Sequence, residues 1–182
     1  MTVRTRTFIT RRAVQRGGFT LIELIAVMVI LGILAAAALP AMDSMEQNRR
    51  VIATKVLLHG LTFARQHAVA TGLRTWVVFD VDAETWSVLA ENPLLPGRSN
   101  AIAMNDSGTG RAFVERLDGG EFKSVNLISA NFDGQAEIGF DWMGRPINAS
   151  EIDLASQGEV VLSGNHRITV EVETGHVLYV AP

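Results

Sequence analysis

An unbroken apolar run near the N-terminus limits what this chain can fold into. Residues 19–39 read FTLIELIAVMVILGILAAAAL, and Glu23 is the only charged residue in the run. A helix rises about 1.5 Å per residue, so the run is about 30 Å long, the thickness of the hydrocarbon core of a bilayer. The run therefore predicts a single membrane-spanning helix.

Charge is distributed unevenly on the two sides of this run. Residues 1–18 carry five arginines and no acid, whereas the rest of the chain carries all 19 acids against 11 bases, a net charge of −8. Basic flanks stay in the cytoplasm, so we expect the N-terminus inside and the C-terminal part outside. The acidic C-terminal part also disfavours nucleic-acid binding, which needs a basic surface.

Three interpretations of the N-terminal segment are open. A secretory signal has an apolar core of about 7–15 residues followed by small residues at the cleavage site, a pattern that Ala35–Ala38 imitates. A plain single-pass anchor is the second interpretation. Neither accounts for Gly17-Gly18 directly before the run or for a carboxylate five residues into it.

The third interpretation accounts for both features. Residues 17–23, GGFTLIE, are similar to the processing site of type IV prepilins and type II secretion pseudopilins. This resemblance implies cleavage after Gly18 by a prepilin peptidase on the cytoplasmic face, followed by N-methylation of Phe19, while the apolar segment stays attached. A glycine before the scissile bond also leaves the backbone open to close approach by a protease.

Glu23 is costly in an apolar helix, so it is expected to have a partner. The best candidate is the amine created at Phe19, either in the same chain or in a neighbouring subunit of a filament. Such a pair would fix the axial register of assembly. A proton path is the alternative, but the run contains no second ionisable residue.

The helix is expected to continue beyond the run to Thr71, with a kink at Pro40 and a C-cap at Gly72. An apolar stripe with helical spacing supports an amphipathic helix that faces a domain. The stripe consists of Leu57, Leu61, Ala64 and Ala68.

Two short segments resemble the GspH/FimT group of minor pseudopilins and minor pilins. Residues 64–72, ARQHAVATG, are similar to its A-R-x-x-A-x-x-x-G segment, and residues 140–146, FDWMGRP, to its F-x-x-x-G segment. From the residues alone, we interpret Arg65 as a solvated residue that favours the helix dipole. Phe140–Gly144 reads as a strand that runs into a glycine turn.

Residues 73–182 predict a β-rich head. The patterns indicate a hairpin over 73–90 and a closing hairpin in which Ile168, Val170 and Val172 alternate with polar residues. Further strands are expected at 112–117, 123–131 and 136–141, with turns at 119–120 and 133–134. Residues 92–110, rich in Pro and Gly, predict a mobile loop that offers a docking surface to a partner. The fold class is α+β, pilin-like: a long N-terminal helix packed on an antiparallel sheet or sandwich.

No pattern for catalysis, a metal or a cofactor is found. The chain has no cysteine, which excludes thiol chemistry and disulfides, and its four histidines have no ligand spacing. Asp80, Asp82 and Glu84 are read as solvated turn carboxylates, because the calcium loop of an EF-hand needs a glycine and a terminal glutamate. An enzyme is therefore not expected.

The predicted divisions are a cleaved leader (1–18), a membrane span (19–39), an amphipathic helix (40–72) and a periplasmic head (73–182). The resemblance implies a minor pseudopilin of a type II secretion system, anchored in the inner membrane and assembled into a periplasmic filament. Its partners would be the prepilin peptidase/N-methyltransferase, other pseudopilins or pilins, an inner-membrane assembly platform and the lipid bilayer.

Two other functions stay open on the sequence. The first is a minor pilin of a type IV pilus, acting in assembly priming, adhesion or DNA uptake. The last eight residues contain no basic side chain but His176, which disfavours DNA binding. The second, a membrane-anchored envelope enzyme, lacks a catalytic grouping.

Overall fold

The computed structural model describes residues 19–106, 110–117 and 119–182, without the side chains of residues 37–44. The predicted leader, and Gly18 with it, lies outside the described residues. The chain forms two compact units, Met1–Ala41 and Met42–Pro182.

One long helix, α1, runs from Leu21 to Thr71 and passes through Pro40 without interruption. Its start is defined by Thr20, whose side-chain oxygen accepts a hydrogen bond from the Glu23 N–H at 3.3 Å. Its end is defined by Gly72, at φ +73°, whose N–H bonds the carbonyl of Ala68 at 2.9 Å. The predicted single helix and its glycine C-cap are therefore confirmed.

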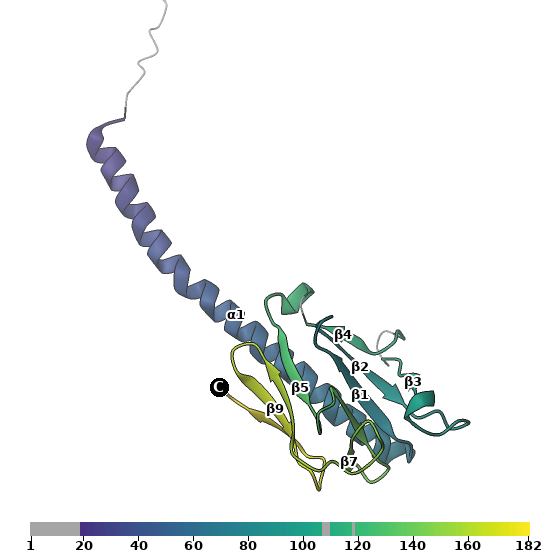
Figure 1. The fold of residues 1–182 in the computed structure, drawn as a ribbon. Coiled ribbons are helices and arrows are strands. Elements are labelled where there is room, and N and C mark those ends of the chain that lie inside the picture. The colour runs from purple at the N-terminus through teal and green to yellow at the C-terminus, as the bar shows by residue number, and fades with distance from the viewer. Residues whose placement is uncertain (1–18, 107–109, 118) are drawn as a thin grey trace, which may run out of the picture. The chain divides into compact units, whose positions relative to one another are not determined.

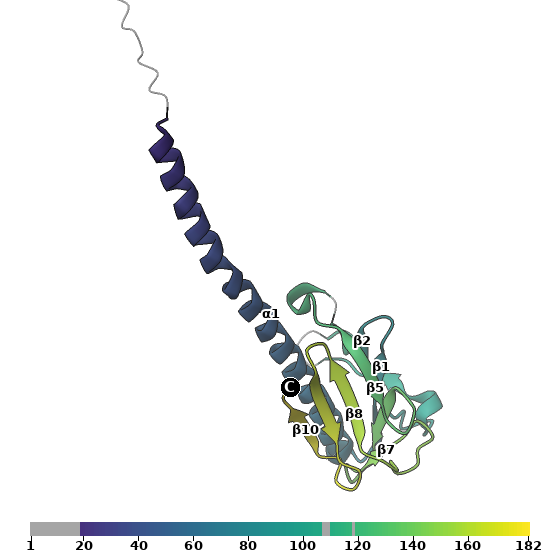
Figure 2. The same ribbon diagram turned by 60° about the vertical axis from the view of Figure 1, so that its left-hand side comes forward.

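The second unit contains two antiparallel sheets beside residues 42–71 of α1 (Figures 1 and 2). The six-stranded sheet has the order β3-β2-β1-β6-β7, with β4 also paired to β2. Its strands are β1 (Thr75–Asp80), β2 (Thr85–Ala90), β3 (Ile102–Ala103), β4 (Val114–Arg116), β6 (Glu137–Phe140) and β7 (Pro146–Ile147). The four-stranded sheet has the order β10-β9-β8-β5. Its strands are β5 (Leu127–Asn131), β8 (Gly158–Leu162), β9 (His166–Val170) and β10 (Val177–Val180).

The helix and both sheets share one hydrophobic core. The predicted apolar stripe of α1 is completely buried, and Ala53 extends it by one turn. The stripe packs with Phe79, Trp86 and Val88 from the first sheet and with Val160 and Ile168 from the second. The predicted α+β architecture is confirmed, because a helix with an apolar stripe and sheets with one apolar face can bury them only against each other.

Several strand predictions are confirmed and others need correction. The hairpin over 73–90 forms as β1 and β2, and the closing hairpin forms as β9 and β10. The predicted turn at Gly119-Gly120 leads into a short 3₁₀ helix, η2 (Gly120–Phe122), since Phe122 turns inward and is buried. Strand β8, which pairs on both sides with β5 and β9, was not predicted.

The predicted loop 92–110 is held by ion pairs over its first part. Arg74 Nη1 lies 2.5 Å from Glu151 Oε2, and the backbone N–H of Arg98 donates to Glu151 Oε1 at 2.6 Å. The Arg98 guanidinium also pairs with Glu137. These contacts fix the 3₁₀ helix η1 (Arg98–Asn100), and β3 follows directly. Residues 107–109 lie outside the described residues.

The packing of α1 on the first sheet depends on Gly60. A Cβ atom placed at Gly60 would lie 2.1 Å from Cη2 of Trp86, and that ring is fully enclosed in the core. The steric conflict outweighs the gain in helix propensity, which is about 1 kcal/mol for Gly→Ala. We expect Gly60→Ala to destabilise the chain by about 1–3 kcal/mol, the usual cost of overpacking, in denaturant unfolding followed by tryptophan fluorescence.

Gly119→Ala is the matched control. A Cβ placed at Gly119 would have no described atom within 4 Å, and the φ of this residue is −131°. Its stability should stay within about 0.5 kcal/mol of the parent. Equal stability of the two variants would contradict the close contact between α1 and Trp86.

Candidate assembly site

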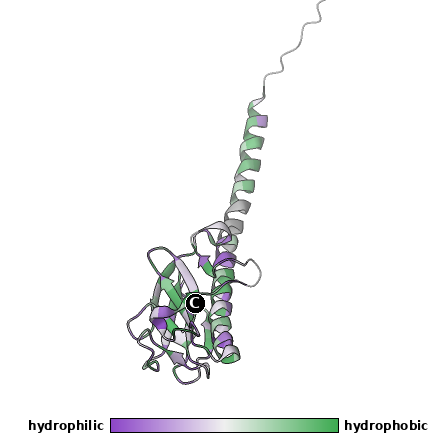
Figure 3. Ribbon diagram, turned by 90° about the vertical axis from the view of Figure 1, so that its right-hand side faces the viewer, coloured by the Kyte–Doolittle hydropathy of each residue, from purple (hydrophilic) through white to green (hydrophobic). Residues whose placement is uncertain are grey.

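The first unit presents apolar side chains on all sides of α1. Every residue from Phe19 to Ala36 is exposed, and the large apolar ones are 47–78% exposed. The large ones are Phe19, Leu21, Ile22, Leu24, Ile25, Val27, Met28, Val29, Ile30, Leu31, Ile33 and Leu34. Figure 3 shows the hydrophobic colour along this part of the helix. A helix that is apolar all round requires cover from lipid or from other protein.

Within the described part of the chain, no helix is both long and apolar enough to cross a bilayer. The membrane span over 19–39 stays a prediction.

Glu23 lies in the first turn of α1, where a carboxylate interacts favourably with the helix dipole. Thr20 and Glu23 have the spacing of a capping box, and the backbone N–H of Glu23 bonds both oxygens of Thr20. Sequence reasoning missed Thr20, although T-x-x-E before an apolar run is a helix-start signal. The pattern places Phe19 just outside the helix and one turn before the Glu23 carboxylate.

In the second unit, Arg65 joins three segments that are distant in the sequence. Its Nε donates to the carbonyl of Gly144 at 3.0 Å and to that of Thr174 at 3.2 Å. The interpretation of Arg65 as a solvated residue that favours the helix dipole is wrong, because the side chain is half-buried and lies before the last turn. Its role is to hold two turns of the head against α1.

Two glycines make this junction possible. Gly144 and Gly175 have φ of +80° and +65°, which L-residues with a side chain rarely adopt. A Cβ at Gly175 would lie 2.3 Å from the carbonyl oxygen of Gly144, and one at Gly144 would lie 2.9 Å from Cγ2 of Val69. The two segments that resemble the GspH/FimT group therefore meet in space, through Arg65 and Gly144.

The turn between β6 and β7 is organised around Asp141, which is only 5% exposed. Its Oδ1 accepts hydrogen bonds from the backbone N–H groups of Met143 and Arg145, at 2.9 and 2.8 Å. Its Oδ2 accepts one from Nε of Arg145 at 2.9 Å, and this carboxylate raises the pKa of Arg145. Both oxygens of one carboxylate thus hold the turn in a fixed conformation.

The histidines do not form a site within the described part of the chain. His67 shares a 3.2 Å hydrogen bond with Thr75 Oγ1, and burial lowers the pKa of its imidazole. The ring of His166 is buried against Tyr179, 2.7 Å from its hydroxyl, and burial lowers its pKa as well. Among the described residues, no group of three or more His, Asp or Glu side chains is placed to hold a metal ion.

Two of the three carboxylates of the β1–β2 turn accept hydrogen bonds from the backbone. Asp80 accepts a hydrogen bond from the N–H of Ala83 at 2.8 Å, and Glu84 accepts one from the N–H of Leu127 at 3.2 Å. These are turn-stabilising bonds of the kind that Asp and Glu make with free backbone donors.

One surface hollow of about 280 Å³ lies on the head, lined by Arg145, Asp153, Leu154, Val172 and Glu173. Arg145 already pairs with Asp141 at 2.8 Å. The lining carries two carboxylates, Asp153 and Glu173, and Arg145 Nη1 lies 3.5 Å from Asp153 Oδ2.

The N-terminal segment has a family match. Residues 15–39 match the family model of the prokaryotic N-terminal methylation motif. This match supports the predicted resemblance of the segment to type IV prepilins and pseudopilins.

The fold matches two solved structures of the minor pseudopilin EpsH from the type 2 secretion system of Vibrio cholerae. The matches have TM-scores of 0.53 each at 15% and 14% identity. Each covers 74% of this chain, and 96% or 97% of the EpsH chain. No curated protein matches the sequence. The motif supports the predicted resemblance to the pilin and pseudopilin superfamily, and the solved structures show that the chain shares its fold with a minor pseudopilin.

Removal of the Arg65 side chain tests the junction. Arg65→Ala leaves the carbonyls of Gly144 and Thr174 without the donor that they share. A hydrogen bond to a charged group contributes at most about 1.5–3 kcal/mol to the free energy of unfolding. We expect a loss of about 1–2 kcal/mol in denaturant unfolding, since both bonds are partly open to water. Gln66→Ala, at an exposed neighbouring position, should change little, and an unchanged stability of Arg65→Ala would contradict the junction.

Proposed function

We propose that the chain is a minor pseudopilin of a type II secretion system, a structural subunit of a periplasmic filament. The observation that carries the proposal is the coincidence of the methylation motif over residues 15–39 with a head whose fold covers nearly all of EpsH. The subunit is not an enzyme in this proposal. Its work is assembly.

In this proposal, processing creates the assembly end of the chain. A prepilin peptidase cuts between Gly18 and Phe19, and the new amine at Phe19 is methylated. That amine is positive and lies beside the positive end of the α1 dipole, which is unfavourable. Glu23, in the first turn, offsets both charges and lowers the cost of placing the helix start among apolar neighbours.

The exposed apolar surface of α1 determines where the chain resides. We propose that residues 19–39 lie in the inner membrane, with the N-terminus cytoplasmic and residues 73–182 in the periplasm. During assembly, lipid around the helix is exchanged for the apolar helices of other pseudopilins, with an inner-membrane assembly platform as the place of exchange.

A minor pilin of a type IV pilus is the second candidate, because it shares the motif and the type of fold. The two functions differ in what is lost with the gene. Deletion should abolish export of folded proteins through the outer membrane if the chain serves secretion. Loss of surface pili with secretion intact would instead identify a minor pilin.

The processing step is tested by Gly18→Val. We expect the parent chain, extracted from membranes, to begin at a methylated Phe19 in mass spectrometry. The β-branched side chain at position 18 should block close approach of the peptidase and leave the precursor uncut. Val27→Ala, within the apolar run, is the control and should be cut normally. A Met1 terminus on the parent chain in cells with active prepilin peptidase would contradict the proposal.

The carboxylate is tested separately by Glu23→Ala. The variant should insert into the membrane as efficiently as the parent chain does, since the substitution removes a charge from an apolar helix. It should enter filaments poorly, because the amine at Phe19 loses its counter-charge. The measurement is the ratio of filament to membrane protein in immunoblots, with Glu46→Ala, in the second unit, as control. Normal incorporation of Glu23→Ala would remove Glu23 from the mechanism.

A further inference from the structure

The turn between β6 and β7 exposes a large part of two apolar side chains. Trp142 is 59% exposed and Met143 is 44% exposed, and Val69, which lies against the same turn, is 52% exposed. These three side chains are named the Trp142 patch. A buried Trp covers about 150–250 Å², so Trp142 alone leaves on the order of 100 Å² of apolar surface in water.

This exposure is built into a fixed turn. The carboxylate of Asp141 accepts hydrogen bonds from the N–H groups of Met143 and Arg145. Gly144 lies between these two residues, and its carbonyl accepts a hydrogen bond from Arg65 of α1. A side chain held in place before binding loses little conformational freedom when a partner arrives. Trp on a pre-organised surface is also the residue type that most often dominates binding.

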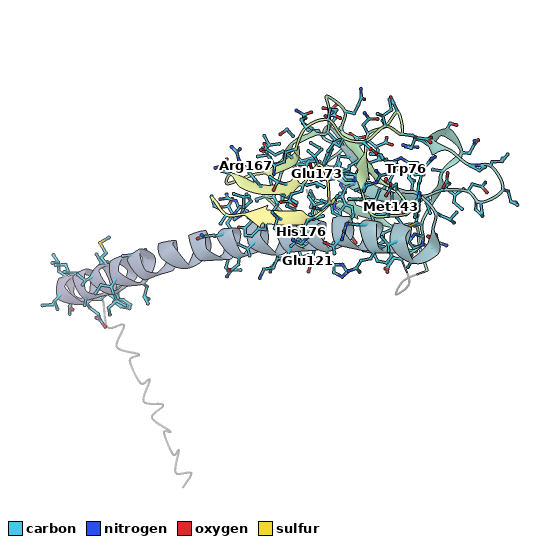
Figure 4. All side chains as sticks on the ribbon, turned by 90° about the horizontal axis from the view of Figure 1, so that it is seen from below. Trp76, Glu121, Met143, Arg167, Glu173 and His176 are labelled. Atoms are coloured by element: carbon cyan, nitrogen blue, oxygen red, sulfur yellow. The ribbon has the colours of Figure 1, made fainter. Side chains whose placement is uncertain are left out.

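The patch continues an exposed strip of α1. Figure 4 shows Met143 and His176 beside the helix, where the two turns held by Arg65 meet it. The strip follows one face of α1 at helical spacing. Its exposed members are Ile52, Lys55, His59, Gln66 and Val69. Ile52 and Val69 are apolar, whereas Lys55, His59 and Gln66 between them are polar, so an apolar partner would be held mainly at the end of the strip that meets the patch.

The charges around the patch fit an apolar partner. The carboxylate of Asp141 is neutralised by Arg145 at 2.8 Å, and the Nε of Arg65 is engaged by two carbonyls. The charged side chains that the structure describes at this turn are therefore already engaged when a partner with few charges arrives. The N-terminal part of α1 shows what such a partner looks like: a helix with large apolar side chains on every side and Glu23 as its one charge.

We propose that the Trp142 patch docks the apolar N-terminal helix of another subunit of the same filament. This inference rests on the proposed function, since it requires a filament in which such helices leave the lipid. Trp142 is the anchor of the contact, Met143 adapts to the side chains of the incoming helix, and Val69 joins the contact to α1.

The test is photo-crosslinking in cells that assemble the filament from the full chain. A benzophenone amino acid is placed at position 143 in the processed protein, and the cross-linked peptide is identified by mass spectrometry. The proposal predicts a peptide from the apolar N-terminal helix of a mature pilin-type subunit. The same probe at Ile128, on β5 and 56% exposed, is the matched control and should not capture that helix.

Two variants sharpen the result. Trp142→Ala should lower the cross-link from position 143 by about tenfold or more, as truncation of a dominant aromatic contact does. Gly18→Val should abolish it, because the unprocessed chain stays out of the filament. A cross-link to the head of another subunit, to lipid only, or at the Ile128 level would overturn the docking proposal.

The failure of this inference is distinguishable from failure of the proposed function. If the parent chain is cut at Phe19 and recovered in filaments but gives no helix cross-link, the docking proposal alone is wrong. If the chain is never cut or never enters a filament, the proposed function is wrong and the docking proposal falls with it.

Discussion

Apolar surface without cover is the constraint on which the rest of this molecule depends. From Leu21 to Leu34, α1 presents large apolar side chains in every direction, and Glu23 is the only charged residue of this part. The hydrophobic effect makes such a helix unfavourable in water, by about 25 cal/mol for each Å² of exposed apolar area. The chain can satisfy this surface with lipid or with other protein, and the proposed assembly role uses both.

In the second unit, by contrast, the apolar residues of the same helix are confined to one stripe. Leu57, Leu61 and Ala64 are buried in the head, and Gly60 allows Trp86 to approach closely. Arg65 then ties two turns of the head to the helix through backbone carbonyls. One element thus acts as the scaffold of a folded domain and as an apolar helix that needs partners.

The sequence patterns predicted the elements that depend on residues close together in the chain. They did not predict the contacts between residues far apart in the chain. The helix, its buried stripe, the β1–β2 hairpin and the closing hairpin follow from periodicity and turn residues. The two bonds of Arg65 join residues 79 and 109 positions apart, so no spacing rule predicts them. Strand β8 was missed although its alternate residues are buried, and the ion pairs that fix residues 97–100 bring together side chains from four separate segments. The helix start at Thr20 follows the T-x-x-E spacing that is visible in the sequence, and the Thr20 hydroxyl accepts the Glu23 N–H there.

The central claim is that α1 is built to be covered by the helices of other subunits. The most direct measurement is the composition of filaments sheared or extracted from cells that make the chain at its natural level. We predict that the purified filaments contain this chain, beginning at Phe19, at a fixed ratio to the main subunit. A chain that is cut at Phe19 but found only as a membrane-bound monomer, while the other subunits polymerise, would contradict the claim.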